Sequence, residues 1–146
     1  MGQLSRDRVV GLTPFGRPEA AMVVGLCRAG ALGLLDLGRD RAAALDALAE
    51  VCRWTDQAFG VRVGARAPVG PGDLPVQVDT VLVASAHDAD RWRSEGRRVL
   101  VEARSPDEAE AAVAAGAAGL VAKGSESGGR IGDLTTFVLL QHLVDR

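Results

Sequence analysis

The chain has 146 residues, 47% of them hydrophobic and 25% charged, which is the balance of a folded globular domain and not of a disordered segment. A net charge of −2, with no basic stripe interleaved with aromatic residues, argues against nucleic-acid binding. No apolar run is long enough to cross a bilayer and the N-terminus lacks the apolar block of a signal peptide, so we expect a single cytoplasmic domain covering residues 1–146.

From residue 8 onward, short apolar runs alternate with longer Ala-rich amphipathic stretches. The short runs predict strands over residues 8–14, 32–38, 59–64, 78–85, 97–105 and 117–124. The amphipathic stretches predict helices over residues 17–31, 40–55, 86–96, 106–116 and 131–146. Residues 65–75 contain two Gly and three Pro, which predicts no regular element there.

Three of the predicted helices have recognisable first turns. Pro18 is expected in the first turn of its helix, where the missing N–H costs nothing. Asp40 is expected as an N-cap, because its carboxylate can accept from a backbone N–H of the first turn. Ser105 and Glu108, with Pro106 between them, predict a capping box.

Six strand-then-helix units with strands apolar on both faces predict an α/β fold of parallel strands covered by helices. An open doubly wound sheet and a (β/α) barrel both satisfy this pattern, but polar or Gly-rich residues follow nearly every strand, where a barrel gathers its functional loops. A closed barrel needs eight such units. We therefore expect an incomplete TIM-barrel-like fold, part of a longer polypeptide, whose exposed strand edges pair with other domains of that polypeptide or with a second copy.

The stretch "GSESGGRIGDLTTF", residues 124–137, joins the sixth predicted strand to the last predicted helix. A Gly-rich turn at a helix start exposes backbone N–H groups that can bind an anion or let a flat ligand approach closely. The spacing matches neither the phosphate-binding loop that ends in Gly-Lys-Ser/Thr nor the dinucleotide pattern G-x-G-x-x-G. The alternative interpretation is a loop that needs its glycines only in order to turn.

Residues "AKGSESGGRIGDLTTFVLL" resemble a segment of FMN-dependent nitronate monooxygenases and of the related FMN-dependent enoyl-acyl carrier protein reductases. In those families a strand is followed by Gly-x-Glu-Ala/Ser-Gly-Gly-His-x-Gly and then by a helix. Weaker likenesses extend over "GLTPFGRPEAAMVVGLCRAGALGLLDLG", "FGVRV" and "SPDEAEAAVAAGAAGLVAKG". The resemblance therefore covers nearly the whole chain in register.

The resemblance implies a flavin, FMN, lying over the carboxyl ends of the strands. It implies that residues 11–14, with Gly11 and Thr13 among them, pass beside the isoalloxazine ring. It also implies that Lys123 contacts the cofactor through its side chain and Gly128 through its backbone, with Gly129 adjoining them.

Three departures from the family pattern bear on function. Arg130 stands at the place of the family's catalytic histidine, and a guanidinium can donate hydrogen bonds or stabilise negative charge but cannot exchange a proton near neutral pH. Arg62 stands where the relatives carry a flavin-contacting asparagine. The phosphate-binding loops of the relatives belong to the seventh and eighth units, which have no counterpart here.

Two functions are consistent with these features. One is a divergent, non-catalytic or cofactor-poor barrel domain that serves as a scaffold or docking element of a polyketide or fatty-acid synthase type multienzyme, with an acyl carrier protein among its possible partners. The other is an FMN-dependent oxidoreductase acting on an enoyl thioester or a nitronate, in which Arg130 stabilises charge on the substrate oxygen. Whether NADH or NADPH would serve as reductant does not follow from the residues.

The remaining candidate residues have ordinary alternative roles. His87 follows the fourth predicted strand and suits either acid–base chemistry or a helix cap. Asp36 ends the second predicted strand and suits either the mouth of a barrel or the capping of a turn. Trp54 and Trp92 are expected to pack, and His142 is expected to pack or to lie at an interface. Cys27 and Cys52 are expected to be reduced thiols in helices, and no His, Cys or carboxylate residues recur at metal-ligand spacing.

Overall fold

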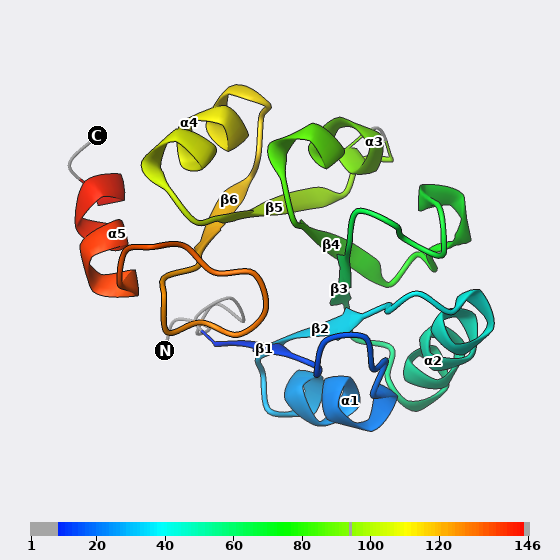
Figure 1. Ribbon diagram of the computed structural model, residues 1–146. Coiled ribbons are helices and arrows are strands. Elements are labelled where there is room, and N and C mark those ends of the chain that lie inside the picture. Colours follow the sequence, from blue (N-terminus) through cyan, green and yellow to red (C-terminus); the bar gives the residue numbers. More distant parts are fainter. Residues whose placement is uncertain (1–8, 94, 145–146) are drawn as a thin grey trace, which may run out of the picture. The chain divides into compact units, whose positions relative to one another are not determined.

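The computed structural model describes residues 9–93 and 95–144, so Arg8 of the first predicted strand and residues 145–146 of the last predicted helix lie outside the described residues. Strands and helices alternate throughout this part of the chain (Figure 1). In chain order they are β1 (Val10–Leu12), α1 (Ala20–Arg28), β2 (Leu32–Asp36), α2 (Arg41–Trp54), β3 (Phe59–Val63), the 3₁₀ turn η2 (Pro71–Asp73), β4 (Val78–Val83), the 3₁₀ turn η3 (Ala86–Asp88), α3 (Ala89–Arg93), β5 (Arg98–Ala103), α4 (Pro106–Ala114), β6 (Gly119–Ala122) and α5 (Thr136–Val144).

The strands form one sheet in the order β1-β2-β3-β4-β5-β6. β1 pairs with β2, β2 with β3 and β5 with β6, each time in parallel. A doubly wound sheet reverses its strand order at a switch point, whereas a barrel keeps neighbours in sequence order. The sequential order therefore confirms the predicted α/β fold of consecutive parallel β/α units and excludes the doubly wound alternative.

The chain divides into two compact units, Met1–Val81 and Leu82–Arg146. In the first unit α1 packs on β2 and on α2. All five residues of β2 are buried, as expected of a parallel strand that is covered on both faces. Gly33 lets α1 approach β2 closely, since a Cβ there would lie 3.0 Å from the Val23 side chain.

In the second unit α3 and α4 pack on β5, and α4 also packs on α5 (Figure 1). Trp92 of α3 is 2% exposed and is the largest fully buried side chain of the protein's described part. Ala109 and Ala112 form the buried stripe of α4, where small side chains let the helix lie close to the sheet. Burial of each large apolar side chain contributes about 1.5–3 kcal/mol to the free energy of unfolding.

The predicted helix caps are confirmed at Asp40 and confirmed in part at Ser105. The Asp40 carboxylate accepts from the Ala43 N–H at 3.0 Å. The Ser105 hydroxyl accepts from the Glu108 N–H at 3.2 Å. The Glu108 carboxylate does not complete the box on Ser105 but accepts from the N–H and guanidinium of Arg104, one residue earlier.

Two predictions for the first unit were wrong. The helix expected from residue 17 begins at Ala20, because residues 14–19 form tight turns in which the Arg17 N–H donates to the Pro14 carbonyl at 3.0 Å. Pro18 therefore precedes the helix. The segment expected to lack regular structure contains η2, which Asp73 stabilises by accepting from the Gly70 N–H and by pairing with Arg41.

No helix in the part of the chain that the structure describes is long and apolar enough to span a membrane.

Replacing Asp40 with Ala should lower the free energy of unfolding by about 1 kcal/mol, because the first turn of α2 loses its capping acceptor. Urea denaturation followed by circular dichroism measures the change. Asp46→Ala, an exposed replacement in the middle of the same helix, is the matched control and should change the value by less than about 0.5 kcal/mol. Equal effects of the two replacements would contradict the capping role.

Candidate functional site

The carboxyl ends of β1, β2 and β3 meet at the buried side chain of Asp36, which is 3% exposed. Its Oδ1 atom accepts from the N–H groups of Gly16 at 3.1 Å and of Gly38 at 2.8 Å. Its Oδ2 atom accepts from Nη1 of Arg62 at 2.8 Å. Register explains the ion pair, because Asp36 and Arg62 are directly paired residues of β2 and β3. Both oxygens of the carboxylate are thus satisfied within the first unit.

Thr13, in the loop after β1, is hydrogen-bonded to the backbone of Asp36. Its hydroxyl oxygen accepts from the Asp36 N–H at 2.8 Å, and its own N–H donates to the Leu34 carbonyl at 3.0 Å. The side chain is 1% exposed. Thr13 therefore extends the pairing of β1 and β2 beyond the last residue of β1.

Phe15 covers the guanidinium of Arg62, whose central carbon lies 4.5 Å from the centre of the ring. This is the distance of a cation–π contact, in which the negative face of the ring attracts the cation. The Arg62 side chain is 14% exposed, so the ion pair and the ring together withdraw most of it from water. We call Thr13, Phe15, Asp36 and Arg62 the Asp36 cluster.

The structure brings together two of the three predicted site residues of the first unit. Thr13 and Arg62 both belong to the Asp36 cluster. Gly11 lies in β1 but faces α1, because a Cβ there would lie 2.4 Å from the Leu26 side chain. Of the two roles open to Asp36, the capping of a turn is the one observed, through the Gly38 N–H two residues on. The contact of Phe15 with Arg62 leaves no signal in the sequence.

The Asp36 cluster lies where the resemblance implies a flavin. A flavin at these strand ends needs polar groups with unused hydrogen-bonding capacity and an open face for the ring. The Thr13 hydroxyl is buried against Asp36, the Arg62 guanidinium is ion-paired and Phe15 covers one of its faces. The two polar side chains that the resemblance assigns to a flavin in the first unit, Thr13 and Arg62, are thus both engaged by Asp36.

In the second unit the loop of residues 123–135 folds on itself. Nζ of Lys123 donates to the Gly128 carbonyl, and the Lys123 carbonyl accepts from the Gly132 N–H at 3.2 Å. Ser125 donates its N–H to the Leu134 carbonyl at 2.8 Å. Lys123 and Gly128 were both predicted to contact a cofactor, and the structure bonds them to each other.

Two glycines of this loop are explained by contacts within the chain. A Cβ at Gly124 would lie 2.1 Å from the backbone nitrogen of Thr136, and a Cβ at Gly132 would lie 2.2 Å from the Arg104 carbonyl oxygen. Gly129 has a φ of 76°, a left-handed conformation that favours glycine. The loop therefore needs these glycines to fold, which supports the simpler of the two interpretations of the motif.

Glu126 caps the helix that follows the loop. Its carboxylate accepts from the Thr136 N–H at 2.9 and 3.1 Å, so α5 begins at Thr136 and the predicted start at residue 131 was wrong. Hydrogen bonds from its own N–H and from the Thr136 N–H lower the pKa of Glu126. An acceptor ten residues ahead of a helix leaves no local signal in the sequence.

Arg130, the predicted catalytic residue, is exposed on this loop. Among the described residues no hydrogen bond or ion pair holds its guanidinium. Glu102 and Lys123 are 4% and 7% exposed. Glu102 pairs with Val121, so Lys123, two residues beyond Val121, lies on the same face of the sheet as Glu102.

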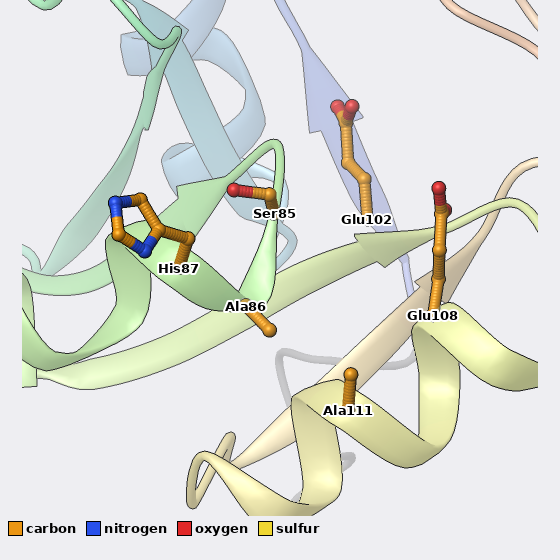
Figure 2. Close-up of a pocket in the computed structure, with 6 residues that line it drawn as sticks. All are labelled: Ser85, Ala86, His87, Glu102, Glu108 and Ala111. Carbon is orange, nitrogen blue, oxygen red and sulfur yellow. The ribbon is translucent and has the colours of Figure 1, made fainter.

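A cavity of ≈ 220 Å³ lies at the carboxyl ends of β4 and β5 (Figure 2). Ser85, Ala86 and His87 line it from the loop after β4, Glu102 from β5, and Glu108 and Ala111 from α4. Figure 2 shows the Glu102 and Glu108 side chains pointing in the same direction. Glu108 is ion-paired with Arg104, and the Ser85 hydroxyl donates to Asp88 at 3.0 Å. Glu108 and Ser85 of this cavity thus serve local structure.

The remaining candidates differ in burial. Trp92 packs as predicted, whereas Trp54 is 57% exposed, so its predicted packing was wrong. His142 is exposed, so it does not pack within the chain, and its interface role stays a prediction. The thiol of Cys27 is buried and that of Cys52 is half-buried, and neither forms a disulfide. Within residues 9–93 and 95–144, no three His, Cys, Asp or Glu side chains form a group that could hold a metal ion.

No family model matches the chain, and no curated protein matches it. Its fold is that of (β/α) barrel enzymes, as comparison with solved structures shows. FabK from Thermotoga maritima is 29% identical with a TM-score of 0.71, over 94% of this chain and 47% of FabK. A single-residue mutant of FabK is 28% identical with a TM-score of 0.72, over 94% of this chain and 49% of the mutant.

A nitroalkane oxidase from Streptomyces ansochromogenes is 22% identical with a TM-score of 0.75, over 94% of this chain and 55% of the oxidase. The chain thus spans about half the length of the solved structures that it matches. Its fold is an incomplete TIM-barrel-like α/β fold of six β/α units, as predicted.

Replacing Asp36 with Asn should lower the free energy of unfolding by about 3 kcal/mol, because the buried Arg62 guanidinium loses its counter-charge. Urea denaturation at neutral pH measures the change. Asp56→Asn, at an exposed position of the same unit, is the control and should leave stability unchanged. A change below about 0.5 kcal/mol for Asp36→Asn would show that the cluster does not hold the strand ends together.

The stabilising effect of Glu126 should depend on pH. Because its folded pKa is lowered from the ordinary 4.5, its contribution is present above that value and is lost as the pH falls through the folded pKa. The melting temperature of the wild type should exceed that of Glu126→Gln at pH 7, and the gap should close at strongly acidic pH. Glu95→Gln, which alters an exposed residue, controls for general charge effects. A gap that stays constant with pH would contradict the cap.

Proposed function

We propose that this chain is a divergent barrel domain of the FMN-dependent oxidoreductase type that does not hold flavin by itself and serves as a structural element. The observation that carries the proposal is the Asp36 cluster. Its hydrogen bonds and ion pair satisfy, from within the chain, the groups that would have to receive a cofactor. The resemblance of residues 124–137 to the FMN-dependent families and the likeness to FabK support the FMN-dependent oxidoreductase type of barrel.

The second unit supports the same proposal. A helix N-terminus with glycines before it is the site where a protein binds phosphate or another anion. At α5 this site is taken by the Glu126 carboxylate. Lys123, the cation nearest the motif in sequence, donates to the Gly128 carbonyl.

The larger setting that we propose is a multienzyme of the polyketide or fatty-acid synthase type, in which the domain acts as a scaffold or docking element. The sequence likeness to enoyl-acyl carrier protein reductases supports this setting, since such enzymes act on carrier-bound thioesters. An acyl carrier protein is accordingly the partner that we expect first.

A second candidate function is an FMN-dependent enoyl-thioester reductase, and the 28–29% identity to FabK favours it. In that case Arg130 is the residue of this chain suited to stabilise negative charge on a thioester oxygen. It is exposed, and no hydrogen bond among the described residues restrains it. A guanidinium cannot act as the general base at neutral pH.

Purified chain should be colourless, and added FMN should keep its full fluorescence, because Asp36 and Phe15 already engage the side chains of Thr13 and Arg62. Fluorescence titration of FMN with the protein measures binding, with FabK as the positive control. Saturable quenching together with oxidation of NADH or NADPH in the presence of an enoyl thioester would overturn the proposal. That result would support the second candidate, and Arg130→Ala would then be expected to slow the reaction.

A further inference from the structure

A groove of ≈ 390 Å³ lies between α1 and α2 on the surface of the first unit. Ala21, Val24, Gly25 and Arg28 of α1 form one wall, and Glu50 and Trp54 of α2 form the other. We call it the α1–α2 groove. It lies wholly within one compact unit and shares no residue with the Asp36 cluster.

Trp54 is the most informative residue of this groove, because 57% of its surface is exposed. It is the last residue of α2, and its carbonyl accepts from Nη2 of Arg28 at 3.3 Å. The bond fixes the end of α2 against α1. Exposed tryptophans that border a groove are typical of protein–protein interfaces, where they supply much of the binding free energy.

Gly25 gives a second and independent indication that another protein chain binds at this groove. It lies inside α1, where glycine lowers helix stability relative to alanine. A Cβ at Gly25 would meet no atom within 4 Å, so packing within the chain does not require a glycine there. Close approach of a second chain over this part of α1 would require it.

The charges of the groove favour a second copy of the chain as the partner. Arg28 stands on one wall and Glu50 on the other, so the groove carries one cation and one anion. A two-fold interface brings the same patch of two copies together, so that Arg28 of each copy can meet Glu50 of the other. A surface with its own complementary charges suits a second copy better than an acidic or a basic partner.

We propose that the α1–α2 groove is a self-association surface, in which two copies pair about a two-fold axis. Trp54 of each copy packs over the small residues Ala21 and Gly25 of the other, while Arg28 and Glu50 form two reciprocal ion pairs. The inference is independent of the function proposed above, because it uses no residue of the strand ends.

Sedimentation velocity over a range of concentrations tests the proposal on the full chain. The wild type should form a dimer. Glu50→Arg should weaken the dimer by about tenfold or more, because it sets two arginines against each other. Arg28→Glu combined with Glu50→Arg should restore association, since the pair is exchanged and not removed. Gly25→Leu should abolish it by filling the groove.

Glu95→Arg makes the same change of charge at an exposed position of the second unit and should leave the dimer unchanged. Thermal melts of every variant separate loss of association from loss of folding. A wild type that stays monomeric at all concentrations overturns the proposal. So does a dimer that Glu50→Arg and Gly25→Leu both leave intact.

Discussion

Burial of the Asp36 carboxylate is the constraint on which the first unit depends. An isolated carboxylate taken out of water costs several kcal/mol, and only hydrogen bonds and an opposite charge offset that cost. Two glycine N–H groups and the Arg62 guanidinium provide them. Because these partners come from the loops after β1 and β2 and from β3, one buried charge fixes the course of three consecutive segments.

In the second unit, too, a carboxylate of the chain accepts a hydrogen bond from a backbone N–H group. Glu126 reaches the free N–H of Thr136 at the start of α5, and Lys123 reaches back to the Gly128 carbonyl. In each unit a carboxylate of the chain occupies backbone N–H groups that, in a phosphate-binding or cofactor-binding loop, would face the ligand. The loops that contain Gly16, Gly38 and residues 123–135 have the glycine-rich composition of a binding site, and their hydrogen bonds to Asp36 and Glu126 stabilise the fold.

The sequence was sufficient for the order of strands and helices, because a parallel strand buried on both faces reads as a short apolar run such as residues 32–35 of β2. It was also sufficient for the Asp40 cap, which depends on residues three apart. The start of α5 was missed although Thr135, directly before it, accepts from the Val138 N–H at 3.4 Å; the second acceptor, Glu126, lies ten residues away through a folded loop. The Phe15 contact with Arg62 was not predictable either, because it depends on how the loop after β1 folds over a residue of β3.

The charge states of the strand-end residues restrict any chemistry available to this chain. At neutral pH a guanidinium stays protonated, so neither Arg62 nor Arg130 can remove a proton from a carbon acid. Arg62 is also committed to Asp36, which leaves Arg130 as the cation free to act on a substrate from the loop after β6. An exposed charge is screened by water and stabilises a developing anion far less than a buried one does. Catalysis by Arg130 would therefore need further structure to exclude water from its loop.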